Sequence, residues 1–186
     1  QRKGRKINEL AGRSVEYGGY LSVDLTQLAS HVTKGGVKQT AAGSLPDSSL
    51  YAVSNDELAI LTYERAQNVV GWSRWVTDGT IESVGVTSGG GEDDDIYISV
   101  NRGGSRTIEY YSPDMTRVEE ANDAENFVFL DSCVKKFNAT AFTTVTGLSH
   151  LEGKEVNMFV DGEMQGSATV NSGTVTLLRE GNRAVV

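Results

Sequence analysis

The stretch Ser49-Leu50-Tyr51-Ala52-Val53 decides the fold, because a similar stretch, Asp95-Ile96-Tyr97-Ile98-Ser99-Val100, follows later in the chain. The two tyrosines lie 46 residues apart, and the apolar runs before and after them recur at spacings of 44 and 47 residues. These flanking runs begin at Val37 and Ile81, and at Leu61 and Ile108. A repeat of this length built from short antiparallel strands is typical of propeller blades, so the sequence predicts two blade-like sheets.

Alternation of apolar and polar residues predicts strands on both sides of this repeat. The first region is expected to hold Gly36–Ala42, Ser49–Ser54, Leu58–Glu64, Val70–Thr77, Ile81–Thr87, Ile96–Asn101 and Thr107–Ser112. The second region is expected to hold Phe127–Leu130, Thr140–Thr146, Val156–Val160, Ser167–Val170 and Thr174–Leu178. Their hairpin tips are predicted at Asn55-Asp56, Arg102-Gly103-Gly104, Asp161-Gly162 and Ser172-Gly173, where glycine and small polar residues allow positive φ angles.

One segment carries the signals of a helix. Asp24 followed three residues later by Gln27 resembles a capping box, and an apolar stripe recurs at helical spacing up to Val32. The glycines at 35 and 36 are suited to end such a helix, which is therefore predicted over residues 24–33.

The predicted fold is mainly β: propeller-blade-like antiparallel sheets with one short helix, followed by a small β-barrel or β-sandwich. Residues 1–113 are assigned to the propeller-like region and residues 127–186 to the small all-β domain. The polar, acidic stretch 114–126 is assigned to a connector between them. Because the chain starts at Gln1 and ends on the apolar run Ala184–Val186, and because two blades cannot close a propeller, we expect it to be part of a longer protein.

Composition excludes several functional classes. The chain has 186 residues, with 17 basic and 25 acidic ones, a net charge of −8 and a pI near 4.8, which disfavours a nucleic-acid coat. The single cysteine, Cys133, excludes an internal disulfide and is expected to be a small buried hydrophobe. No apolar run has the length of about 20 residues that a membrane helix needs.

No catalytic or metal-binding constellation is recognised, and no cofactor is expected. His31 and His150 lie at a predicted helix end and a turn, where a structural role is expected. The acidic run Glu92–Asp95 lacks the ligand spacing of a calcium loop, so it is interpreted as a solvated hairpin tip. Hydrolysis of a glycoside needs two carboxylates, and no sequence pattern singles out such a pair here. A glycan-degrading enzyme is therefore kept only as a third hypothesis.

Aromatic residues offer the one candidate interaction surface. Trp72, Trp75, Tyr63 and Tyr110 are the residues proposed for it, since such side chains form platforms for sugars or partner proteins. On a strand, residues 72 and 75 point to opposite faces, so one tryptophan is expected in the core and the other on a surface or neighbour.

Seven segments, taken in order, resemble a family of structural proteins from the tails of bacteriophages and prophages, related to the tail nozzle, or tail tubular protein B, of short-tailed phages. The segments are Lys6–Leu10, Gly19–His31, Leu58–Arg65, Val69–Trp75, Ile81–Val86, Thr146–Val156 and Val160–Gly162. The resemblance covers roughly residues 5–186, although members of the family are much longer.

The resemblance implies a non-enzymatic virion component that assists tail assembly and genome ejection. It implies a ring, hexameric in the intact protein, whose partners are other tail proteins and copies of itself. Passing DNA is a possible further partner that is not specifically bound, and no membrane partner is expected. It carries no catalytic residues over to this chain. The alternative hypothesis is a carbohydrate- or receptor-binding module of a phage tail, based on the tryptophans and tyrosines.

Overall fold

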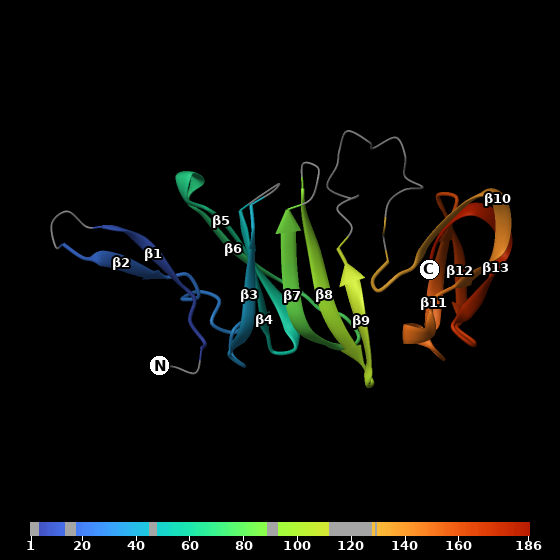
Figure 1. Ribbon diagram of the computed structural model, residues 1–186, viewed down its shortest axis with the longest axis horizontal. Helices are drawn as coiled ribbons and strands as arrows, with labels where there is room; N and C mark the ends of the chain where they lie inside the picture. The colour runs from blue at the N-terminus through green and yellow to red at the C-terminus, as the bar shows by residue number, and fades with distance from the viewer. Residues whose placement is uncertain (1–3, 14–17, 45–47, 89–92, 112–127, 129) are drawn as a thin grey trace. The chain divides into compact units, whose positions relative to one another are not determined.

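The computed structural model describes residues 4–13, 18–44, 48–88, 93–111, 128 and 130–186. It is mainly β, as the sequence predicted, and the strands of the described residues pair in antiparallel fashion. The chain divides into two compact units, of which the first holds Gln1–Gly104 with Ile108–Tyr111 and the second holds Ser105–Thr107 with Ser112–Val186. Figure 1 labels the strands in chain order.

Two meanders form the body of the first unit, and of their strand residues only Ser105–Thr107 fall outside it. The first is a four-stranded sheet, and the second is a three-stranded sheet of order β7-β8-β9. Their strands are β3 (Val37–Gly43), β4 (Ser49–Ser54), β5 (Glu57–Glu64), β6 (Val69–Trp75), β7 (Thr80–Ser88), β8 (Asp94–Arg102) and β9 (Ser105–Tyr110). All seven agree with predicted strands to within about two residues at each end.

The repeat seen in the sequence is also a repeat of strand register. Tyr51 pairs with Ala41 across β3 and β4, and Tyr97 pairs with Gly85 across β7 and β8. Each residue pair between β3 and β4 has a counterpart between β7 and β8, which lies 44 residues later on the first strand and 46 residues later on the second. Even the irregularity recurs, since the register shifts between Val37 and Gln39 and again between Ile81 and Ser83. The two pairs of strands are therefore structurally equivalent.

The tips predicted for these hairpins are confirmed. Asn55 and Asp56 have φ angles of 55° and 65°, which suits a two-residue turn between β4 and β5. Gly103 and Gly104 have φ angles of 62° and 99° between β8 and β9. Because both turns take positive φ values at consecutive residues, the strands leave them with the right-handed twist of a sheet.

The two sheets share one apolar core. The residues that they bury between them are Tyr51, Val53, Leu58, Ile60, Ile81, Val84, Ile96 and Val100. Each sheet contributes alternate residues of its strands, so each presents one face to the other. The amide of Gln39 adds a fixed point, donating to the carbonyl oxygen of Val84 at 3.0 Å and accepting from its N–H at 3.2 Å. This pair of bonds joins β3 to the free edge of β7.

The other face of the four-stranded sheet is covered by residues 25–36. Ala29 and Val32 pack there against Ala52 and Ala59, with Trp72 at the side of the cluster. Thr26 and Thr33 are likewise buried, at 2% and 0% exposure. The first sheet is thus covered on both faces, by the second sheet and by this segment.

The helix predicted over residues 24–33 is wrong, because the segment is a series of turns. The backbone N–H groups of Ala29, Val32 and Gly36 each donate to the residue three positions earlier. The Leu25 carbonyl oxygen, which a helix over 24–33 would bond to the Ala29 N–H, accepts the Trp72 indole N–H instead, at 2.8 Å. At the other end of the segment, Asn55 Nδ2 donates to the carbonyl oxygens of His31 and Val32 at 3.3 and 3.1 Å. Leu28, expected on the apolar stripe, is 98% exposed.

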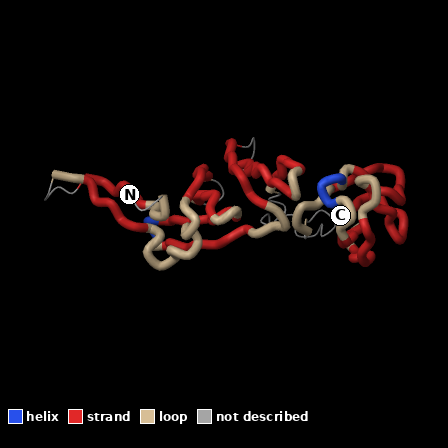
Figure 2. Tube along the Cα trace, turned by 90° about the horizontal axis from the view of Figure 1, so that it is seen from below, coloured by secondary structure: helices blue, strands red, loops and turns tan. Residues whose placement is uncertain are grey.

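A two-stranded hairpin precedes this segment and was not predicted. It consists of β1 (Asn8–Arg13) and β2 (Tyr20–Asp24). Its base is closed by Lys6, which bonds the Asp24 carboxylate, and is joined to β5 by Glu9, which accepts a bond from Tyr63. In both Figure 1 and Figure 2 the hairpin runs away from this base.

The second unit is a single four-stranded sheet of order β10-β13-β11-β12, which does not close into a barrel. It comprises β10 (Lys135–Thr146), β11 (Glu155–Val160), β12 (Glu163–Thr169) and β13 (Thr174–Val185). A 3-10 helix, η5 (Ser149–Leu151), follows β10, and another, η1 (Arg65–Gln67), lies in the first unit. The turns predicted at 161–162 and 172–173 are present, with positive φ at all four residues.

The core of the second unit gathers on one side of its curved sheet. Its fully buried members include Val145, Leu148, Met158, Val160 and Val170. The predicted barrel or sandwich is therefore replaced by one sheet folded over its own core. The predicted connector 114–126 lies outside the described residues, and of the predicted strand 127–130 only Val128 and Leu130 are described, neither of them in a strand.

The packing between the two sheets can be tested with two isoleucines of the three-stranded sheet. Ile81 is 1% exposed in the shared core, whereas Ile108 is 74% exposed. We expect Ile81→Ala to lower the free energy of unfolding by about 2–5 kcal/mol and Ile108→Ala to change it by less than about 0.5 kcal/mol. Urea unfolding followed by tryptophan fluorescence measures this, because both tryptophans lie in the first unit. Equal losses in the two variants would show that the sheets do not share a core.

The anchoring of the hairpin predicts a dependence on pH. Hydrogen bonds from Lys6 and then Thr26 lower the pKa of Asp24 from 3.8 to about 2. A carboxyl whose pKa is lower in the folded state stabilises the fold above its unfolded pKa, and this contribution is lost as the pH falls through the folded value. Asp24→Asn should therefore lower the urea midpoint at pH 6, and the difference from wild type should shrink between pH 4 and pH 2.

The matched control is Asp56→Asn, which removes a carboxylate from an exposed pair with Lys38 and keeps a residue type that tolerates positive φ. A difference for Asp24→Asn that stayed constant down to pH 2 would contradict the assignment of the low pKa to Asp24.

Candidate functional site

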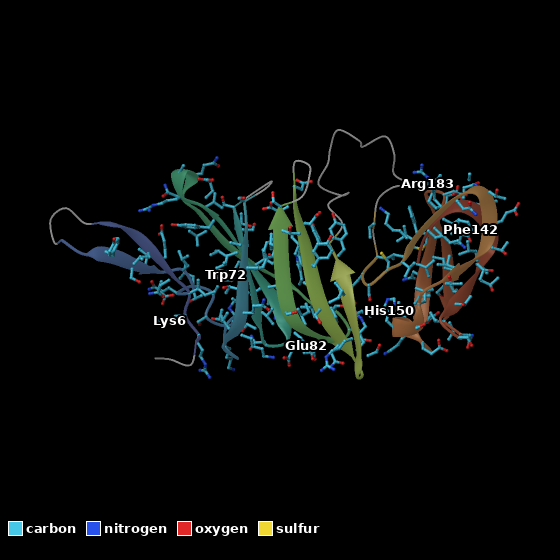
Figure 3. The ribbon with its side chains drawn as sticks, viewed as in Figure 1. Lys6, Trp72, Glu82, Phe142, His150 and Arg183 are labelled. Atoms are coloured by element: carbon cyan, nitrogen blue, oxygen red, sulfur yellow. The ribbon has the colours of Figure 1, made fainter. Side chains whose placement is uncertain are left out.

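Trp72, the first of the four predicted site residues, takes part in intramolecular packing. It lies on β6 with its ring beside the cluster of Ala29, Val32 and Ala52, and its indole N–H donates to Leu25. Figure 3 labels it within the first unit. Its one polar group is therefore used to hold residues 25–36 on the sheet.

Trp75 lies on the opposite face of the same strand, as the spacing predicted. It packs against the core shared by the two sheets. Its ring stacks on Tyr111 with centroids 4.3 Å apart, and Tyr51 lies at 6.2 Å in a tilted arrangement. Both tryptophans are half-buried in packed clusters, so neither stands free as a platform.

Tyr63 closes a small polar network at the base of the N-terminal hairpin. Its hydroxyl donates to Glu9 Oε2 at 2.6 Å, and Arg65 donates to Glu9 Oε1 at 3.1 Å. The bond to Glu9 raises the pKa of Tyr63, since it stabilises the neutral phenol. Tyr63 therefore joins β5 to β1 and does not belong to an open binding surface.

Tyr110 lies elsewhere, on the outer face of the three-stranded sheet. Tyr97 is its neighbour, with ring centroids 5.3 Å apart and planes at 43°. Tyr97, Tyr110 and Ile108 are 39%, 48% and 74% exposed. We call the outer face that carries Gly85, Tyr97, Ile108 and Tyr110 the Tyr97 face.

The Tyr97 face is distinguished by comparison with its equivalent in the first repeat. Tyr51 has the same register position as Tyr97, yet it is 8% exposed because the second sheet covers it. Tyr97 faces away from the shared core, which takes the alternate residues Ile96, Ile98 and Val100 of its strand. The structure thus separates Tyr110 from the other three predicted residues and brings it together with Tyr97. The hairpin tip predicted at Gly103-Gly104 places Tyr97 opposite Tyr110, and this was the signal in the sequence that could have found the pair.

The polar groups of the first unit act mainly in holding strands together. Arg102 forms an ion pair with Glu109, with side chains 6% and 18% exposed, and also donates to Thr77 Oγ1 at 2.8 Å. Of the acidic run, Asp94 accepts a bond from the Ser44 N–H at 2.7 Å and Asp95 accepts one from the Tyr110 hydroxyl at 3.1 Å, while Glu92 lies outside the described residues.

In the second unit, His150 lies in η5, where Figure 3 labels it, and its Nε2 is 2.8 Å from the Ser132 carbonyl oxygen. This contact ties η5 to the chain before β10. Cys133 is half-buried.

The geometry also bears on metal binding and on membrane insertion. Within the described ranges, no three His, Cys, Asp or Glu side chains gather as a metal ion would require. In the same part of the chain, no helix combines the length and apolar character needed to cross a membrane. The Tyr97 face, which exposes three large side chains, suits contact with another molecule.

No protein-family model matches this sequence, and a search of curated proteins found no matching relative. The likeness to phage tail proteins therefore rests on the ordered segments of the sequence.

Proposed function

We propose that this chain is a non-enzymatic structural component of a bacteriophage or prophage tail, of the nozzle or tail tubular type. The order of the seven segments supports this role, and so does the way in which the first unit is built. The observation that carries the proposal is the stacking of two equivalent sheets through apolar faces, with the equivalent face of the second sheet left exposed. A module of this construction is suited to assembly with further subunits.

The charge of the chain fits this role. A net charge of −8 repels DNA, whose binding requires clustered basic residues. A tail protein through which a genome leaves benefits from surfaces to which DNA does not adhere. The partners in this role are copies of the chain, in a ring that the resemblance implies to be hexameric, and other tail proteins of the virion.

A second function, binding of a carbohydrate or receptor, is favoured by one observation. Tyr97 and Tyr110 form an exposed aromatic pair, and the Tyr110 hydroxyl contacts the Asp95 carboxylate. Aromatic faces beside a carboxylate are a common arrangement for sugar recognition. The tryptophans first considered for this role are used in packing, so the tyrosine pair is the surface to test.

The structural role is tested in virions of the phage or induced prophage that encodes the chain. Mass spectrometry of purified particles should find the chain among tail proteins, and an in-frame deletion should give particles that lack a complete tail or fail to eject DNA. A plasmid copy of the gene should restore infectivity. Intact, infectious particles without the chain would disprove the proposal.

The alternative is tested by binding to host surface polysaccharides. If the tyrosine pair recognises a sugar, Tyr97→Ala and Tyr110→Ala should each weaken binding about fivefold or more, because an aromatic contact contributes on the order of 1 kcal/mol or more. Tyr20→Ala, which removes another exposed tyrosine at 71% exposure, should leave binding unchanged. Absence of binding across host polysaccharides would count against this function.

A further inference from the structure

The first unit is a stack of three layers whose order can be followed along the chain. Residues 25–36 cover the Ala52 side of the four-stranded sheet, and the three-stranded sheet covers its Tyr51 side. The last layer ends at the Tyr97 face, which has the same register positions as the covered Tyr51 side. A surface that is an internal interface in the first repeat is thus presented to the outside in the second.

The chemistry of the Tyr97 face suits a protein surface with protruding apolar side chains. Three large side chains, Tyr97, Ile108 and Tyr110, are exposed together on it. Gly85, which pairs with Tyr97, leaves space, because a Cβ built there would meet no atom within 4 Å. In the first repeat the matching residue is Ala41, which packs against the second sheet.

The opposite end of the stack carries apolar side chains that protrude. Leu28 is 98% exposed on the segment that covers the first sheet. The adjoining β1–β2 hairpin exposes Leu10, Tyr20, Leu21 and Val23, at 71%, 71%, 57% and 41%. A two-stranded hairpin with apolar residues of this exposure is marginally stable by itself and gains from a partner.

We propose that the Tyr97 face binds a second copy of this chain head to tail, receiving the end of its first unit that carries Leu28 and the β1–β2 hairpin. This inference rests on the proposed structural role, since it names the partner and the surface by which subunits meet. The contact continues the stacking that already joins the two sheets within one chain. Because the two surfaces differ, the interface is heterologous, and it generates a ring or a filament according to the rotation between copies.

The test uses charge substitutions at two highly exposed positions, where the fold of each subunit is preserved. Ile108→Glu alters the Tyr97 face, and Leu28→Glu alters the opposite end. Self-association is measured by sedimentation velocity and light scattering up to about 1 mM, a concentration at which even a weak contact is populated. Wild type should associate, and each variant alone should associate at least about tenfold more weakly. Leu178→Glu, at a residue 71% exposed on β13 of the second unit, is the matched control and should behave as wild type.

Mixing the two variants decides the geometry. The Ile108→Glu chain keeps an intact Leu28 end, and the Leu28→Glu chain keeps an intact Tyr97 face, so a head-to-tail interface predicts a one-to-one complex that stops at two chains. If both variants lose association and their mixture does not restore it, like surfaces meet and the proposal is wrong.

Other outcomes also overturn the proposal. A wild-type chain that stays monomeric at about 1 mM would overturn it. Association that depends on Leu178, but not on Ile108 or Leu28, would also overturn it. A monomer that binds a polysaccharide through Tyr97 assigns the face to a sugar instead. Virion mass spectrometry tests the structural role separately, so the failure of one proposal is distinguishable from the failure of the other.

Discussion

The contact between the two sheets of the first unit is the interaction on which the rest of that unit depends. Every second residue along the strands of each sheet is apolar and points toward the other sheet. A sheet alone would expose these apolar residues to water, so each sheet needs the other as a cover. Gln39 fixes the relative position of the sheets, because its amide bonds both backbone groups of Val84. Once the Tyr51 side is covered in this way, the Ala52 side still needs a cover, and residues 25–36 supply it.

Residues 25–36 fold differently from their local sequence pattern, whereas the strands of the two meanders follow theirs. The strands of the two meanders could be predicted because alternation, β-branched residues and positive-φ turns all favoured the same structure. The helix predicted over 24–33 was wrong because Trp72, distant in sequence, donates to the Leu25 carbonyl that a helix would have used itself. Asn55, also distant, holds the carbonyls of His31 and Val32. These tertiary hydrogen bonds override the local helical signals. The buried residues Thr26, Ala29 and Val32 are three positions apart, which suits a series of turns.

The N-terminal hairpin and the site residues were missed for different physical reasons. The strands β1 and β2 carry only a short alternation, Leu21-Ser22-Val23-Asp24, and the apolar residues Leu10, Tyr20, Leu21 and Val23 are all exposed. The aromatic site could not be predicted from residue type, because Tyr51 and Tyr97 have equivalent positions in the strand register. Their exposures, 8% and 39%, differ because Tyr51 faces the second sheet and Tyr97 faces away from the shared core. Which side of a repeated sheet is covered depends on how the sheets stack, and the tyrosine alone does not show it.

The repeat also indicates how contacts at the two equivalent faces differ in strength. Gln39 is matched in the second repeat by Ser83, whose shorter side chain cannot reach across to a neighbouring strand as the glutamine amide does. Val53 is likewise matched by Ser99, which removes an apolar side chain from the outer face. The internal interface is therefore apolar and fixed by hydrogen bonds, whereas the outer face relies on Tyr97, Ile108 and Tyr110. In the proposed tail assembly, a contact at this weaker face becomes populated only when several such contacts are made together.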